Sequence, residues 1–170
     1  QKKIKYSLKN ILSQKRDCLS VAGEINQMRE RIYKNKFDAK NWYTTHIRGG
    51  ILDIEFIAQY LILIYYSDFP MILKNNTAQT LKEIVKIKLL NPTEGKFLID
   101  SLELWLALWS LTTLTMDNSS NNINESSLPN SLKVELATIG KVTTFKALKN
   151  KIFESSNKVS NIYTQILKKK

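Results

Sequence analysis

"RGGILDIEFIAQYLIL", from Arg48 to Leu63, is the stretch that decides the fold. Two glycines precede a long apolar run with helical spacing, and only three polar residues interrupt that run. A helix that is apolar on nearly every side has to be enclosed by other elements of the protein. The stretch therefore predicts a central helix that starts just after Gly50 and lies mostly buried.

Helical periodicity continues along nearly the whole chain, and no segment alternates cleanly as a strand would. The sequence SDFP should end the central helix, because its proline cannot continue a helical ladder. Further helices are expected over residues 3–15, 19–33, 76 or 77 to about 89, 95–116, 129–140, and from 143 or 144 onward. The fold class predicted is all-α, a bundle of about six to seven helices.

Three of these helices carry patterns that predict their buried faces. In the second, Ile25, Met28 and Ile32 should face the core, with Arg29 and Arg31 turned away. The helix over 95–116 carries two tryptophans four residues apart, which we assign to the core. The last helix has a repeat of apolar residues that Ser155 interrupts: Phe145, Leu148, Ile152, Val159, Ile162 and Ile166.

The length of 170 residues suits one domain with a sizeable core. The low-complexity sequence DNSSNNINESS predicts a flexible polar loop at about 117–128. We therefore expect a single helical domain over residues 1–170. Because the chain starts on Gln1 with no initiator methionine, we expect it to be a fragment of a longer protein.

The formal net charge of +11 suggests an anionic partner, but the kind of cation argues against nucleic acid. Lysines heavily outnumber arginines, and scattered lysines are usually a solvated face rather than a phosphate-binding site. The charge is concentrated at the two ends, particularly over residues 133–170. A basic helical module that binds nucleic acid or an acidic protein through its C-terminal helices stays open as the alternative function.

Composition excludes several other classes. The single cysteine, Cys18, rules out a disulfide framework and fits a reducing, cytoplasmic compartment. Cys18 and the single histidine, His46, are spaced wrongly for a metal site or a catalytic pair. No secretory signal is present, and the longest apolar stretch is interrupted by Asp100 and Glu103, so no membrane span is expected.

The polar residues of the central helix need an explanation. Asp53 falls in the first turn, where free N–H groups and the helix dipole favour a carboxylate, while Glu55 and Gln59 share one face. One interpretation is that Asp53 caps the helix and Glu55 pairs with a nearby Arg or Lys. The other is that these residues line a cleft. The chain has no DxD, HExxH or phosphate-binding loop, so we assign no catalytic or metal-binding residue to it.

A resemblance to a known family favours the cleft. "EINQMRERI" at 24–32, "RGGILDIEFIAQYLIL" at 48–63 and "PMILKNNTAQTLKEI" at 70–84 resemble the bacterial glutamine synthetase adenylyltransferases. The transferase half of that family reads roughly EI-xx-MR, then D-x-K, then GG-xx-DIEF-I-x-Q-YL. The resemblance covers residues 19–114 and then fades into a generic helical tail.

The resemblance implies a helical domain that follows the C-terminal, adenylylating nucleotidyltransferase half of a bifunctional enzyme. Such an enzyme transfers AMP from ATP to a tyrosine of glutamine synthetase and also removes it. ATP and Mg²⁺ would serve the full-length parent, and the fragment alone should be inactive because the metal-binding carboxylates lie upstream. The implied partners are glutamine synthetase, the upstream nucleotidyltransferase domain and the nitrogen-signalling PII protein.

The same resemblance implies an active-site-facing or interdomain motif that consists of Arg48, Gly49, Gly50, Asp53, Glu55 and Gln59. One departure concerns the D-x-K element, since eight residues separate Lys40 of "FDAK" from Gly49. The register next to the glycines offers Tyr43 and Thr45 instead, so no functional lysine is assigned. A purely structural scaffold that shares the motif is the third interpretation.

Overall fold

The computed structural model describes residues 2–36, 47–115 and 128–168. These residues form seven α-helices and one short 3₁₀-helix, and none of them is in a strand. The elements are α1 (Lys2–Leu12), α2 (Cys18–Lys36), α3 (Ile51–Tyr65), η1 (Pro70–Ile72), α4 (Thr77–Lys86), α5 (Pro92–Thr115), α6 (Asn130–Ile139) and α7 (Phe145–Lys168). The predicted all-α bundle of six to seven helices is confirmed.

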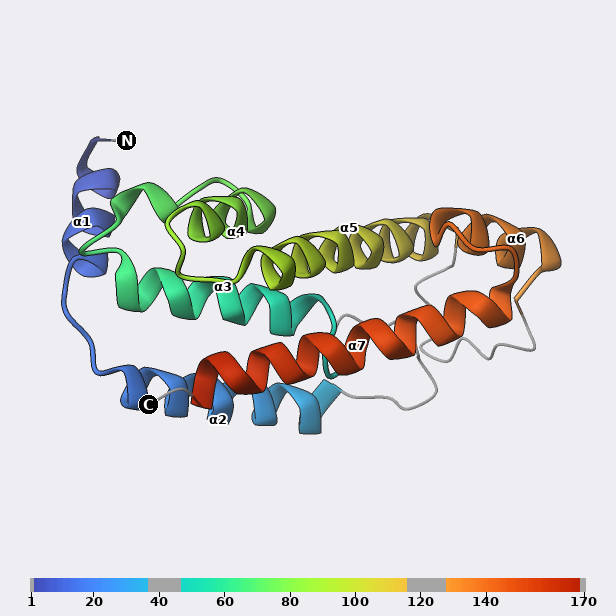
Figure 1. Ribbon diagram of the computed structural model, residues 1–170, viewed down its shortest axis with the longest axis horizontal. Coiled ribbons are helices and arrows are strands. Elements are labelled where there is room, and N and C mark those ends of the chain that lie inside the picture. The colour runs from blue at the N-terminus through green and yellow to red at the C-terminus, as the bar shows by residue number, and fades with distance from the viewer. Residues whose placement is uncertain (1, 37–46, 116–127, 169–170) are drawn as a thin grey trace.

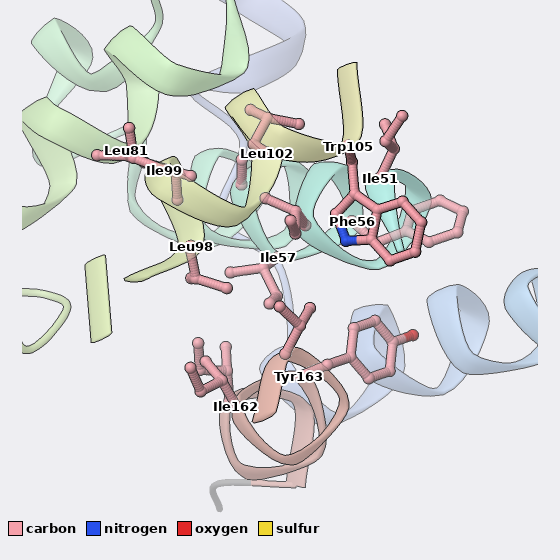
Figure 2. Packing of buried hydrophobic residues seen from close by; sticks show 14 of the residues in the cluster. Ile51, Phe56, Ile57, Leu81, Leu98, Ile99, Leu102, Trp105, Ile162 and Tyr163 are labelled. Carbon is pink, nitrogen blue, oxygen red and sulfur yellow. The ribbon is translucent and has the colours of Figure 1, made fainter. Parts of the chain in front are cut away.

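The quoted stretch forms the helix at the centre of the bundle. Helix α3 runs between α4 and α5 on one side and α2 and α7 on the other, and it packs against all four (Figure 1). Helices α5 and α7 continue beyond the start of α3 to one end of the molecule, where α6 packs on both. The core forms where α3, α5 and α7 meet, with Ile57, Leu98 and Ile162 among its buried side chains (Figure 2).

Local sequence explains where these helices begin. The side chain of Asn76 accepts a hydrogen bond from the N–H of Gln79 at 2.8 Å, which confirms the expected cap of α4. Thr144 Oγ1 accepts from the N–H of Ala147 at 3.1 Å at the start of α7. Helix α5 starts three residues earlier than expected, at Pro92, because proline is well suited to the first helical position.

The predicted faces of α2 hold for Ile25, Ile32 and Arg31 and were wrong at two positions. Arg29, expected in solvent, is fully buried, whereas Met28, expected in the core, is 52% exposed. The helix is rotated so that Ile25 and Arg29, four residues apart, both face the bundle. A guanidinium tolerates this position because a carboxylate of α3 lies opposite it.

The buried face of α7 follows the predicted repeat, and Ser155 finds a partner. Five of the six predicted positions are buried: Leu148, Ile152, Val159, Ile162 and Ile166, with Phe145 only half-buried. Ser155 Oγ donates a hydrogen bond to Ser101 Oγ of α5 at 3.0 Å, and both side chains are buried. The interruption of the repeat is therefore a polar contact between two helices.

The two tryptophans of α5 have different environments. Trp105 is buried beside Ile51 at the start of α3, as predicted (Figure 2). Trp109 is 46% exposed, so its assignment to the core was wrong. The buried face of α5 continues from Trp105 through Leu108 and Thr112, and Trp109 lies beside that face.

Helix α5 is also the one helix within the described ranges that is long and apolar enough to cross a membrane by length and composition. It carries Asp100 and Glu103 and packs against α3, α4, α6 and α7. These contacts are those of a core helix in a bundle.

Candidate functional site

The entry into α3 depends on Gly49. Its φ of +72° is in the left-handed region, which side chains other than glycine rarely adopt. A Cβ atom at this position would lie 1.8 Å from the carbonyl oxygen of Ser156 in α7. Gly50 has no positive φ and acts as the N-cap of the helix in an extended conformation. Gly49 is therefore required both for the turn and for the close approach of the turn to the backbone of α7.

Asp53, in the first turn of α3, binds the backbone of the turn that precedes the helix. Its Oδ2 atom accepts a hydrogen bond from the N–H of Gly49 at 2.5 Å, and its Oδ1 atom pairs with Nε of Arg29. Arg29 Nη2 in turn donates to the carbonyl oxygen of Ile47 at 2.8 Å. The exposed fractions of the Arg29 and Asp53 side chains are 0% and 1%. This buried ion pair links α2, the turn and the first turn of α3.

A second layer of polar contacts surrounds the ion pair. Arg48 pairs with Glu30 of α2, and its guanidinium carbon lies 4.9 Å from the centre of the Tyr33 ring. On the α7 side, the hydroxyl of Tyr163 donates to Oδ1 of Asn26 at 3.1 Å. Burial, with a smaller contribution from the negative charge of Asp53, raises the pKa of Tyr163 to about 12.

Glu55 and Gln59 lie on another side of α3. Successive residues of an α-helix are rotated by about 100°, so Asp53 and Glu55 point in nearly opposite directions. Glu55 is half-buried, Gln59 is exposed, and Glu55 forms no salt bridge with any described residue. Burial alone raises the pKa of the Glu55 carboxyl. The structure thus brings Arg48, Gly49, Gly50 and Asp53 together and leaves Glu55 and Gln59 apart from them.

A groove of about 450 Å³ separates α2 from α3. Helix α3 contributes Phe56, Gln59 and Leu63 to its walls. Helix α2 and the residues before it contribute the rest, namely Arg16, Asp17, Ser20, Val21, Glu24, Ile25 and Met28. The EI-xx-M part of the first quoted segment and the F-xx-Q part of the second therefore face each other across the groove.

Sequence reasoning missed the role of Arg29 and the exposed position of Met28. The signal was present, because an aspartate in the first turn of a buried helix needs a cation. Arg29 stands in the quoted "MRER" segment and was placed in water on polarity alone. Its pairing with Asp53 makes Met28 available to the groove.

Lysines and acidic residues together line a groove between α5 and α7. That groove, about 910 Å³ between α5 and α7, is lined by the four lysines Lys96, Lys141, Lys151 and Lys158 and by the three acidic residues Asp100, Glu103 and Glu154. Lys158 Nζ lies 4.0 Å from the centre of the Phe97 ring. Carboxylates between the lysines would repel a phosphate backbone laid along this groove.

The described part of the chain offers no cation site. No three His, Cys, Asp or Glu side chains in it come together in a way that could hold a metal ion. The resemblance assigns Mg²⁺ to the full-length parent, and the described residues of this chain do not supply ligands for it. Lys40, Tyr43, Thr45 and His46, discussed above, lie outside the described residues, as does the expected polar loop up to residue 127.

Comparison with known proteins shows the family to which the chain belongs. The family model described as GlnD PII-uridylyltransferase matches residues 27–167. The bifunctional glutamine synthetase adenylyltransferase/adenylyl-removing enzyme of Xanthobacter autotrophicus is 30% identical over 157 residues, 92% of this chain. The enzymes of the same name from Bradyrhizobium diazoefficiens and Rhodopseudomonas palustris are each 26% identical, over 94% and 97% of the chain. The chain spans 16% of the length of each of these relatives. It therefore belongs to the GlnD PII-uridylyltransferase family and is homologous to part of the bifunctional glutamine synthetase adenylyltransferases.

Proposed function

We propose that the chain is the helical accessory domain of a longer glutamine synthetase adenylyltransferase/adenylyl-removing enzyme. The activity for which the relatives are named and the 16% of their length that the chain spans support this assignment. A separate nucleotidyltransferase unit supplies the carboxylates for Mg²⁺ and binds ATP. The enzyme then transfers AMP to a tyrosine of glutamine synthetase in the cytoplasm, under control of the PII protein.

The proposal rests on the side of α3 that carries Glu55 and Gln59, which we call its outer face. Glu55 and Gln59 are polar residues on a mostly apolar helix, and the Glu55 carboxyl is partly desolvated with no salt bridge to a described cation. Such a carboxyl is costly unless a partner covers it with a charge or hydrogen-bond donors. We assign this face, with the adjoining α2–α3 groove, to the contact with the nucleotidyltransferase unit.

The other half of the motif has a supporting role in this proposal. Arg48, Gly49, Gly50 and Asp53 hold the start of α3 against α2 and α7, which fixes the direction of the outer face. Nucleotidyl transfer depends on the placement of nucleotide, metal and acceptor more than on protein nucleophiles. The domain contributes placement, and the 170-residue chain alone transfers no AMP.

The sequence in the first turn of α3 favours the adenylylating half. The removing half of the family resembles GG-I-R-E-IEF, whereas this chain has Leu52 and Asp53 in place of the arginine and glutamate. Assays of the full-length enzyme in both directions separate the two halves. Variants of this domain should reduce AMP transfer and leave phosphorolytic removal of AMP unchanged.

The decisive experiment compares Glu55→Gln and Gln59→Ala in the full-length enzyme. We would measure the incorporation of AMP from labelled ATP into purified glutamine synthetase, together with the melting temperature of each variant. AMP transfer should fall by at least about tenfold for Glu55→Gln, as expected for a group that positions reactants, with the melting temperature unchanged. Asp68→Asn, at an exposed position after α3, is the matched control and should change neither quantity. Full activity of both variants would mean that this face of α3 does not meet the catalytic unit.

A further inference from the structure

Helix α1 has an apolar stripe that the bundle does not cover. Its stripe consists of Ile4, Leu8 and Ile11, which lie on one face of the helix at a spacing of four and three residues. These side chains are 74%, 44% and 55% exposed. Of the α1 side chains that the structure describes, Leu12 alone is buried. The last residue therefore anchors α1 to the bundle, and the rest of the helix projects from it.

The direction of α1 is held by the connector to α2. Arg16 Nη2 donates a hydrogen bond to the carbonyl oxygen of Ile11 at 2.8 Å, and its Nη1 donates to that of Gln14 at 3.1 Å. The next residue, Asp17, precedes α2, and its side chain accepts a hydrogen bond from the N–H of Ser20 at 2.6 Å. Helix α1 consequently stands across one end of the bundle instead of running along it (Figure 1).

A helix in this position needs a partner. Leu12 is the one buried side chain among those described in α1, so the described bundle does little to stabilise this helix. It makes no extensive packing contact with any other described helix. Burial of an apolar stripe against another surface is what usually stabilises such a helix.

The size of the stripe indicates what kind of surface covers it. Three side chains bury far less than the roughly 800 Å² per partner of a stable interface between separate proteins. A contact within one polypeptide needs much less area, because a short linker gives an effective concentration on the order of millimolar. The comparisons are consistent with this, since the family match starts at residue 27, after α1, whereas a relative that aligns over 97% of the chain extends through most of α1.

We propose that α1 is a docking helix whose stripe of Ile4, Leu8 and Ile11 packs into an apolar groove of the nucleotidyltransferase unit of the same polypeptide. This inference rests on the proposed function, which requires such a unit. The groove between α2 and α3 is lined by Arg16 and Asp17 of the connector, so a unit held by α1 lies next to that groove. The docking helix therefore positions the catalytic unit over the outer face of α3.

Hydrogen–deuterium exchange of the α1 amides tests the proposal. In the 170-residue chain alone, residues 4–12 should exchange no more than about tenfold slower than an unfolded peptide, as for a marginal helix. In the full-length enzyme the same amides should exchange at least about 100-fold more slowly than in the 170-residue chain, because docking stabilises the helix against local unfolding. Equal exchange in both proteins, whether fast or slow, overturns the proposal.

Substitutions in α1 test whether its apolar stripe makes the docking contact. The double variant Ile4→Asp/Leu8→Asp in the full-length enzyme should restore the fast exchange of α1 and leave the α3 amides unchanged. Val134→Asp/Phe153→Asp is the matched control, because it places two charges at exposed apolar positions of α6 and α7. Loss of α1 protection in the control and not in the α1 variant overturns the assignment of the stripe.

Two other partners give distinct results for the 170-residue chain. Slow exchange of α1 that appears only with phosphatidylglycerol vesicles indicates a membrane surface, and slow exchange that grows with chain concentration indicates a second copy. Either result overturns the proposal. If the α1 amides of the full-length enzyme exchange fast while the enzyme still adenylylates glutamine synthetase, only the docking of α1 is contradicted. If they exchange slowly while the enzyme does not adenylylate glutamine synthetase, only the proposed function is contradicted.

Discussion

Asp53 and Glu55 are two residues apart on one helix and have opposite environments. Asp53 is buried, pairs with Arg29 and accepts a hydrogen bond from the turn before α3. Glu55 is half-buried without a salt bridge to any residue the structure describes, and burial raises the pKa of its carboxyl. A carboxylate in an apolar helix is therefore structural where the protein supplies its counter-charge, and is available to a partner where the protein does not.

The largest expected effect comes from the Asp53 side. In Asp53→Asn the positive charge of Arg29 remains buried without a compensating carboxylate, which typically costs about 3–5 kcal/mol. We expect that loss in the free energy of unfolding, measured by urea denaturation of the 170-residue chain. Asp100→Asn, at an exposed position of α5, should change it by less than about 0.5 kcal/mol. A loss below 1 kcal/mol for Asp53→Asn, on the order of a surface substitution, would contradict the role of the ion pair.

The turn before α3 should be nearly as sensitive. Gly49→Ala forces a side chain into a left-handed conformation, at about 1–2 kcal/mol, and against the backbone of α7, so we expect a total loss above about 2 kcal/mol. Gly23→Ala is the matched control, since no atom lies within 4 Å of a Cβ in that position of α2. It should stabilise the chain by about 0.5–1 kcal/mol. Similar melting temperatures for the two variants would show that Gly49 is not constrained.

Tyr163 tests the side of the ion pair that faces α7. Tyr163→Phe removes the hydrogen bond to Asn26 and should cost about 1 kcal/mol. Because its pKa is raised to about 12 in the folded protein, the neutral tyrosine contributes stability below pH 10 that is lost as the pH rises towards 12. Absorbance at 295 nm should reveal a component that titrates near pH 12 and is absent from Tyr163→Phe. Tyr6→Phe, on exposed α1, should retain both that component and the wild-type stability.

The smallest change in the free energy of unfolding is expected for a substitution of Glu55. This substitution should stabilise the chain, whereas those above destabilise it. Burial raises the pKa of Glu55, so the folded state favours the protonated form, and this contribution to stability is lost as the pH rises through the raised pKa. Glu55→Gln should therefore stabilise the 170-residue chain at pH 7 by less than about 1 kcal/mol and leave it unchanged at pH 4. Thermal unfolding at the two pH values measures this. Destabilisation at pH 7 would mean that Glu55 has a counter-charge within the chain.

The local features of the fold follow from the sequence. The spacing of apolar residues predicted seven helical regions, and Asn76 and the SDFP sequence at 67–70 predicted where α4 begins and α3 ends. These features depend on residues within one or two turns of each other, where helical periodicity and capping act. The central position of α3 follows as well, because a helix apolar on nearly every side has to be enclosed.

Features that join distant parts of the chain were settled only by the tertiary structure. Polarity alone placed Arg29 in water and Met28 in the core, and both assignments reverse because Asp53, 24 residues away from Arg29, supplies the counter-charge. In the same way, only the packed bundle places Ser155 against Ser101, 54 residues away, and the backbone of Ser156 against Gly49. The helical segments could be predicted because apolar spacing and capping are local, and the central one could be predicted because its own residues are apolar on nearly every side. The tertiary structure decided how each helix is rotated and which carboxylate stays available, because the free energy of a buried charge depends on its partner.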